Sequence, residues 1–223
     1  MTQVRKLAEV PFDFIRKRVA RHVAGLVGIP CEHILTTTSA NLSNMVSMAV
    51  ASLFLPLLAG QILLNQSLSV IPALGLADDA VDPELVNKPR RSDMRFIGRY
   101  MVEFGLLSSA FDFLTFGTLL YLFNATPELF RTGWFVESLL TELVIALVVR
   151  TRRPFFRSRP GNLLLTSTVL LIALTLVIPY LPYMDLFGFV PLPVTLLATL
   201  VAITVFYVGA AEATKRWFYR NGG

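Results

Sequence analysis

Polar side chains interrupt two apolar segments in the first third of the chain. Asn41 and Asn44 are three residues apart, which places them on one face of a helix. Gln66 and Ser69 precede Pro72 in the segment ILLNQSLSVIP. Amide and hydroxyl oxygens are ligands that hard cations prefer, so a cation site is one explanation of these residues. Hydrogen bonding between packed helices is the other explanation, and the spacing by itself favours it.

Pro72 predicts a local change in the helix that carries Gln66 and Ser69. Proline has no N–H to donate, and its ring clashes with the carbonyl group four residues earlier. We therefore expect a break between Leu68 and Ala73. The carbonyl oxygens freed there would add to the candidate cation ligands.

Three acidic residues lie in apolar surroundings further along the chain. Asp112 occurs in SSAFDFLTF, while Glu137 and Glu142 occur in WFVESLLTELV. Because no basic residue occurs at a comparable depth, we expect nearby hydroxyl groups or the acids themselves to be their partners. Both an ion-ligand role and a role as protonated, hydrogen-bonded structural acids fit this pattern.

The elements that carry these residues are predicted from composition. The chain has 223 residues, of which 54% are hydrophobic and 16% charged, and its mean hydropathy is +0.62. A soluble domain carries about 25% charged residues, so the lipid bilayer is the expected environment. Roughly 20 apolar residues cross a bilayer. The fold class is therefore all-α, a polytopic bundle of six transmembrane helices with spans at 41–57, 60–77, 96–123, 134–149, 163–181 and 192–213.

The basic residues support this arrangement of spans. Every Lys and Arg except Arg131 falls in or beside the segments on one side of the six-span arrangement. Since Lys and Arg concentrate on the cytoplasmic side, we expect both termini in the cytoplasm, in a bacterial plasma membrane. The net charge of +5 then needs no nucleic-acid partner. Aromatic residues near the span ends fit the membrane interface: Trp134, Tyr180, Tyr183, Trp217 and Tyr219.

Several stretches together resemble a known family. TSANLSNMVSMAVASLFLPLL, the segment from ILLNQ to PRRSD, RTGWFVESLL and VVRTRRPFFRSRP look like the C-terminal membrane half of a P-type cation-transporting ATPase. The similarity covers about residues 36 to 220 and is greatest to the magnesium-translocating subgroup. It implies that the six spans correspond to the fifth to tenth helices of such a pump. No cofactor is implied with certainty, and Mg²⁺ is the candidate transported ion.

The resemblance also implies a set of cation ligands. The matching positions are Asn41, Asn44, Gln66, Ser69 and Glu137. Val70 stands where the family has its principal aspartate ligand in the sixth helix. Valine cannot coordinate a cation, so we expect weak divalent-cation affinity, which Glu137 could restore only in part.

The N-terminal region divides from the membrane part. In residues 1–35, the stretch VPFDFIRKRV resembles a short remnant of the family's nucleotide-binding domain. Its apolar spacing with interleaved arginines also fits a basic amphipathic helix on the inner membrane surface, which we favour. Residues 36–223 form the predicted C-terminal cation-ATPase transmembrane domain.

The catalytic motifs of the resembled family are absent from this sequence. It contains no DKTGT motif for phosphorylation, no TGE and no GDG-x-ND. We therefore expect a truncated transmembrane module that neither hydrolyses ATP nor transports ions alone. The alternatives are the membrane half of a split pump, which another chain completes in trans, and a small passive cation channel or carrier.

Overall fold

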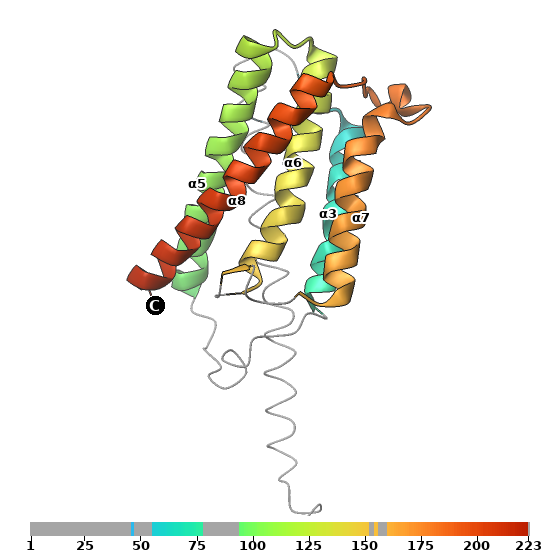
Figure 1. Cartoon of the computed structure of the whole chain (residues 1–223). Helices are drawn as coiled ribbons and strands as arrows, with labels where there is room; N and C mark the ends of the chain where they lie inside the picture. The colour runs from blue at the N-terminus through green and yellow to red at the C-terminus, as the bar shows by residue number, and fades with distance from the viewer. Residues whose placement is uncertain (1–45, 47–54, 78–93, 152–153, 156–159, 223) are drawn as a thin grey trace, which may run out of the picture.

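The computed structural model describes Val46 and residues 55–77, 94–151, 154–155 and 160–222. Within these ranges the long elements are helices that run alternately up and down, side by side (Figure 1). They are α3 (Ala59–Ala77), α5 (Met94–Gly117), α6 (Pro127–Val149), α7 (Asn162–Val177) and α8 (Val194–Gly222). Short helical turns follow two of them: the π-helix η1 (Thr118–Leu122) extends α5, and the 3-10 helices η3 (Ile178–Tyr180) and η4 (Met184–Phe187) follow α7.

Helix α6 is the centre of the bundle. It packs against α3, α5, α7 and α8, and 83% of its most apolar stretch is buried, against about a third or less in the other candidate spans. Its core cluster joins Trp134, Phe135 and Leu139 to apolar residues of α3, α7 and α8. A helix that is apolar on all sides is stable only when neighbours surround it. The other described helices therefore hold the side chains of α6 in position.

Four helices of the described chain are long and apolar enough to cross a membrane. They are Val102–Leu122, Pro127–Val149, Asn162–Tyr180 and Val194–Phe218. The prediction of an all-helical, multi-pass membrane protein is confirmed at this level. The count of six spans is not, because α3 is not among the four and the span predicted at 41–57 lies almost entirely outside the described residues.

Two helices extend beyond the spans predicted for them. Helix α6 begins at Pro127 and not at 134, because Thr126 caps it by accepting a hydrogen bond from Leu129 N at 3.3 Å and Pro127 suits the first helical position. Helix α8 continues past 213 to Gly222. Glu212 forms ion pairs with Lys215 and Arg216 in this extension, at spacings of three and four residues that stabilise helices.

The basic ends of the helices lie at one end of the bundle. The start of α5, the end of α6 and the end of α8 share this end, where the C-terminus also lies (Figure 1). Arg131, the basic residue that the sequence placed on the other side, lies near the opposite end of α6, where its Nε donates to Leu55 O at 2.9 Å. The described part of the chain thus has the basic asymmetry that the sequence predicted. Which end faces the cytoplasm stays a prediction.

Polar contacts hold the α7–α8 loop over the end of the bundle opposite the C-terminus. Gln61, at the start of α3, donates to Gly188 O at 3.3 Å. Thr132 of α6 accepts from Val190 N at 3.1 Å. The hydroxyl of Tyr180 donates to Leu192 O at 2.8 Å. The loop therefore ties α3 and α6 together at this end.

Candidate functional site

The three acidic residues singled out in the sequence lie inside the bundle. Asp112 on α5 is 4% exposed, and Glu137 and Glu142 on α6 are 1% and 6% exposed. The Glu137 carboxyl group is close enough to those of Asp112 and Glu142 to interact electrostatically with both. We call these three residues the acid cluster. Carboxyl groups in such surroundings are costly to ionise, so a bound proton or cation is the natural counterpart of their charge.

Asp112 is held by an indole group, a partner that its position in the sequence did not predict. Trp134 Nε1 donates to Asp112 Oδ1 at 2.7 Å, joining α5 to α6. The Trp134 ring also packs edge-on against Phe116 of α5, with centroids 4.9 Å apart. Trp134 is fully buried, so it does not face the lipid as an interfacial tryptophan would. It lies two turns inside α6, because that helix begins earlier than predicted.

Glu137 is an expected cation residue that the structure places in the core. Its Oε2 atom has no hydrogen-bond partner in the described chain, and the same is true of the buried Thr115 Oγ1 on α5. Buried polar atoms in native proteins are nearly always paired, so such atoms point to a role beyond packing. One oxygen of Glu137 is therefore available to a proton or cation.

Helix α3 carries two more of the expected ligands, Gln66 and Ser69. Ser69 is half-buried, and its Oγ donates to Gln66 O of the same helix at 3.2 Å. Gln66 is also half-buried, while Val70 is 36% exposed. Asn41 and Asn44 lie outside the described residues. The described part of the chain therefore does not test the implied ligand set, which stays a prediction.

The buried face of α3 carries Asn65 instead. Among the α3 residues whose side chains are described, the buried ones are Gln61, Asn65, Pro72 and Gly75, at spacings of four, seven and three residues. At 3.6 residues per turn, Val70 lies on the opposite side of the helix. Asn65 Oδ1 has no hydrogen-bond partner in the described residues, and α3 packs directly against α6. The four-residue spacing of Gln61 and Asn65 places the two residues on one face, but it does not indicate that this face is the buried one.

The expected break at Pro72 was also wrong. Helix α3 continues as an α-helix from Ala59 to Ala77 with Pro72 inside it. A membrane interior tolerates proline when the rest of the backbone keeps its hydrogen bonds. Contacts on both sides of Pro72 hold α3 in place: Leu68 packs on the core cluster, and Gly75 lies against the backbone of Leu164 in α7.

The acid cluster alone does not form a complete metal site. No group of three His, Cys, Asp or Glu side chains close enough to hold a metal ion occurs among the described residues. The arrangement instead supplies a buried carboxyl group with an open oxygen, together with the two further carboxyl groups that interact with it. Such a set can bind protons, or supply part of an oxygen-rich cation shell that other groups complete.

Comparison with known proteins identifies relatives of the whole bundle. Residues 54–217 match the family described as "Cation transporting ATPase, C-terminus". The chain is 36% identical over 200 residues to "Magnesium-transporting ATPase, P-type 1" of Salmonella typhimurium, and 35% identical to the protein of the same name from Escherichia coli K12. Each alignment covers 86% of this chain and 22% of the relative. The chain thus spans about a fifth of the length of these curated relatives.

Proposed function

Because this chain belongs to the family of cation-transporting ATPase C-terminal domains, we propose that its bundle forms part of the membrane route for Mg²⁺ in a P-type pump. The observation that carries the proposal is Glu137. This carboxyl group lies in the core of the central helix with one oxygen unpaired in the described chain. In a magnesium pump that oxygen would bind the cation or a proton during transport.

We propose that the bundle works only together with the catalytic part of such a pump, which supplies the phosphorylation motifs. Phosphoryl transfer needs charged groups positioned around the phosphates, and the phosphorylation motifs are absent from this sequence. The relatives are magnesium-transporting ATPases of which this chain matches 22%. We therefore expect neither ATP hydrolysis nor ion transport from this chain alone.

Complementation in trans tests the proposal. The chain is co-expressed with the part of a magnesium-transporting relative that precedes the region matching this bundle. Membranes with both parts should show magnesium-dependent, vanadate-sensitive ATP hydrolysis, and membranes with either part alone should not. Glu137→Gln should lower this activity, while Glu128→Gln, an exposed residue of the same helix, serves as the matched control.

Two results would contradict the proposal. Vanadate-sensitive hydrolysis by this chain alone would show that the missing motifs are not needed. No hydrolysis from the two parts, when a pull-down shows that they associate, would show that the bundle is not a working half of a pump.

A further inference from the structure

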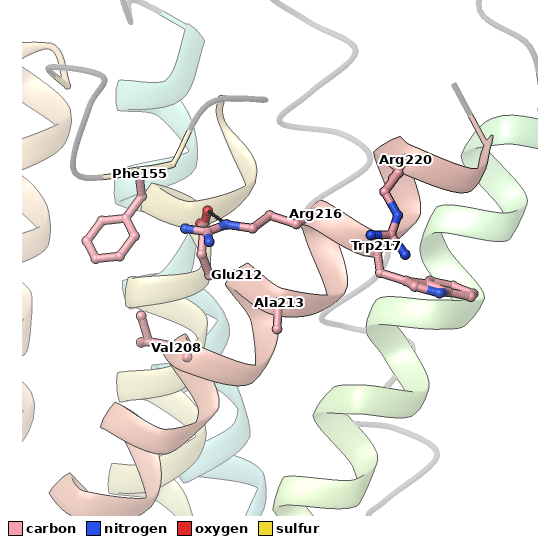
Figure 2. Close-up of a pocket in the computed structure, with 8 residues that line it drawn as sticks. Phe155, Val208, Glu212, Ala213, Arg216, Trp217 and Arg220 are labelled. Atoms are coloured by element: carbon pink, nitrogen blue, oxygen red, sulfur yellow. Dashed lines mark hydrogen bonds and ion pairs between the residues drawn. The ribbon is translucent and has the colours of Figure 1, made fainter.

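A pocket opens on the side of α8 near the end of the bundle that carries the C-terminus (Figure 2). Its volume is about 550 Å³. The residues that decide its chemistry are Val208, Glu212, Arg216, Trp217 and Arg220 of α8, with Phe155 from the segment after α6. None of these residues belongs to the acid cluster.

The pocket carries an excess of positive charge. Glu212 Oε2 lies 2.8 Å from the Nζ atom of Lys215, a residue that is 1% exposed and also donates to Val148 O at the end of α6. Lys215 thus already compensates the charge of Glu212. The Nε atom of Arg216 donates to Glu212 Oε1 at 3.3 Å, and the side chain of Arg216 is 60% exposed. Both guanidinium groups, of Arg216 and Arg220, therefore remain to bind an anion with their other N–H groups.

An apolar stripe on α8 leads into this pocket. Val201, Val205, Gly209, Ala213 and Trp217 are spaced by four residues, so each lies beside the next and the stripe turns gradually around the helix towards Trp217. All five are exposed, and all lie within the candidate membrane span Val194–Phe218. The small residues Gly209 and Ala213 leave a shallow trough between Val205 and Trp217. This face therefore presents lipid-compatible surface that ends at two arginines.

We propose that this pocket binds the phosphate of a phospholipid headgroup, with the lipid's acyl chain lying along the stripe. Arginine binds phosphate through paired N–H donors, and aromatic rings such as Trp217 favour the headgroup level of a bilayer. A free phosphate ion would use the arginines but not the stripe, so the stripe favours a lipid. The two guanidinium groups further favour a lipid with a net negative charge over a zwitterionic one.

The two tryptophans of the chain provide the test. Trp217 is 51% exposed beside the pocket, whereas Trp134 is fully buried. The chain is reconstituted in vesicles that contain phosphatidylglycerol or phosphatidylcholine with brominated acyl chains, and quenching of tryptophan fluorescence is compared. We expect stronger quenching by the anionic lipid than by phosphatidylcholine. In Trp217→Phe, the quenching should no longer differ between the two lipids. Each arginine near an anionic surface contributes about fivefold to the preference.

Variants of the arginines decide whether the pocket is responsible. The double variant Arg216→Gln/Arg220→Gln should lose the preference for the anionic lipid. Arg220→Gln alone keeps the ion pair between Arg216 and Glu212, so it controls for misfolding of the double variant. It should lower the preference for the anionic lipid about fivefold. Arg99→Gln, at an exposed arginine on α5 at the same end of the bundle, should retain the full preference.

Three results would overturn the proposal. The first is equal quenching by the two brominated lipids in the unmodified chain. The second is a full preference for the anionic lipid in a folded Arg220→Gln chain, as judged by circular dichroism. The third is relief of the anionic-lipid quenching by millimolar inorganic phosphate but not by chloride at the same ionic strength, which would assign the pocket to a free anion.

Discussion

Asp112 shows how a single hydrogen bond can place a carboxyl group in the middle of a helical bundle. Its Oδ1 accepts from the Trp134 indole at 2.7 Å, and both residues are buried. An indole N–H can donate but not accept, so the contact suits either protonation state of the acid. The pair joins α5 to α6 beside Glu137, and it therefore fixes the distance between the acids.

Replacing Trp134 by phenylalanine tests this contact. Trp134→Phe keeps an aromatic ring but removes the donor, which leaves a buried carboxyl oxygen with one partner fewer. We expect a loss of about 1–3 kcal/mol in the free energy of unfolding, measured by thermal denaturation in detergent. Trp217→Phe, at the 51% exposed tryptophan, is the control and should change the melting temperature little. Equal melting temperatures for Trp134→Phe and the unmodified chain would contradict this role of the bond.

Val70 provides a second test at the scale of one residue. Val70→Asp adds a carboxylate four residues from Gln66, on the same face of α3. We expect this variant to bind Mg²⁺ more tightly than the unmodified chain, because oxygen dipoles alone replace the tightly held water of Mg²⁺ poorly. Isothermal titration of Mg²⁺ into the purified proteins measures the difference.

A matched variant controls for charge alone. Ile71 is 44% exposed, compared with 36% for Val70. Its side chain leaves the helix axis in a direction about 100° away from that of Val70, because successive helical residues are rotated by this angle. Ile71→Asp should therefore gain no comparable affinity. Equal binding by the two aspartate variants, or tight binding by the unmodified chain, would show that Val70 does not stand at a ligand position.

At the scale of elements, the close approach of α3 and α7 depends on Gly75. A Cβ atom at this position would lie 3.0 Å from Leu164 Cα and 3.2 Å from Leu164 N, both of them backbone atoms. Small residues let membrane helices pack backbone to backbone, and this contact holds the turn of α3 after Pro72 against α7. The contact at Gly75 thereby keeps the buried face of α3, which includes Asn65, turned towards the interior of the bundle.

Gly75→Ala is expected to push α3 away from α7. Overpacking at a fixed backbone contact costs about 1–3 kcal/mol, which should appear as a lower resistance to unfolding in detergent. Gly105→Ala on α5 is the matched control, since nothing lies within 4 Å of the added methyl group. The control should be neutral or stabilising, because alanine favours helix by about 1 kcal/mol over glycine. An equal change in resistance to unfolding in both variants would mean that moving α3 away from α7 does not destabilise the bundle.

At the scale of the whole molecule, the alternating helices put two connections at the end opposite the C-terminus. The α5–α6 connection contains Asn124, and the α7–α8 loop contains the exposed Asp185 (Figure 1). The basic helix ends lie at the other end, which the distribution of Lys and Arg predicts to be cytoplasmic. The two ends should therefore differ in their access to reagents outside the cell.

Cysteine labelling in intact cells tests this orientation. In a Cys31→Ser background, Asn124→Cys and Asp185→Cys should react with a membrane-impermeant maleimide from outside. Ser92→Cys and Ser158→Cys should react only after the cells are opened. Labelling of Ser158→Cys from outside would reverse the predicted orientation, and labelling at Asn124 but not at Asp185 would contradict the arrangement of α5 to α8.

The sequence alone determined the helical class, the membrane environment and the family. Long apolar runs with basic residues at their ends can be recognised segment by segment, without knowing how the segments pack. It also located the acidic residues within the helices that carry them. The start of α6 at Pro127 was not predicted, because the charges of Glu128 and Arg131 lower the hydropathy of its first turns while the cap at Thr126 begins the helix before them.

Only the tertiary structure decided which polar residues face the core. Gln66 and Asn65 are neighbours in the sequence and equally polar, yet Asn65 is on the buried face and Gln66 is not. The indole partner of Asp112 and the continuous helix through Pro72 were likewise not predictable from spacing. Each depends on contacts between helices that are distant in the sequence, and a side chain's direction is set by which neighbour packs against its helix. Local periodicity can say that one face of α3 is buried, but the packing of α6 and α7 selects the face.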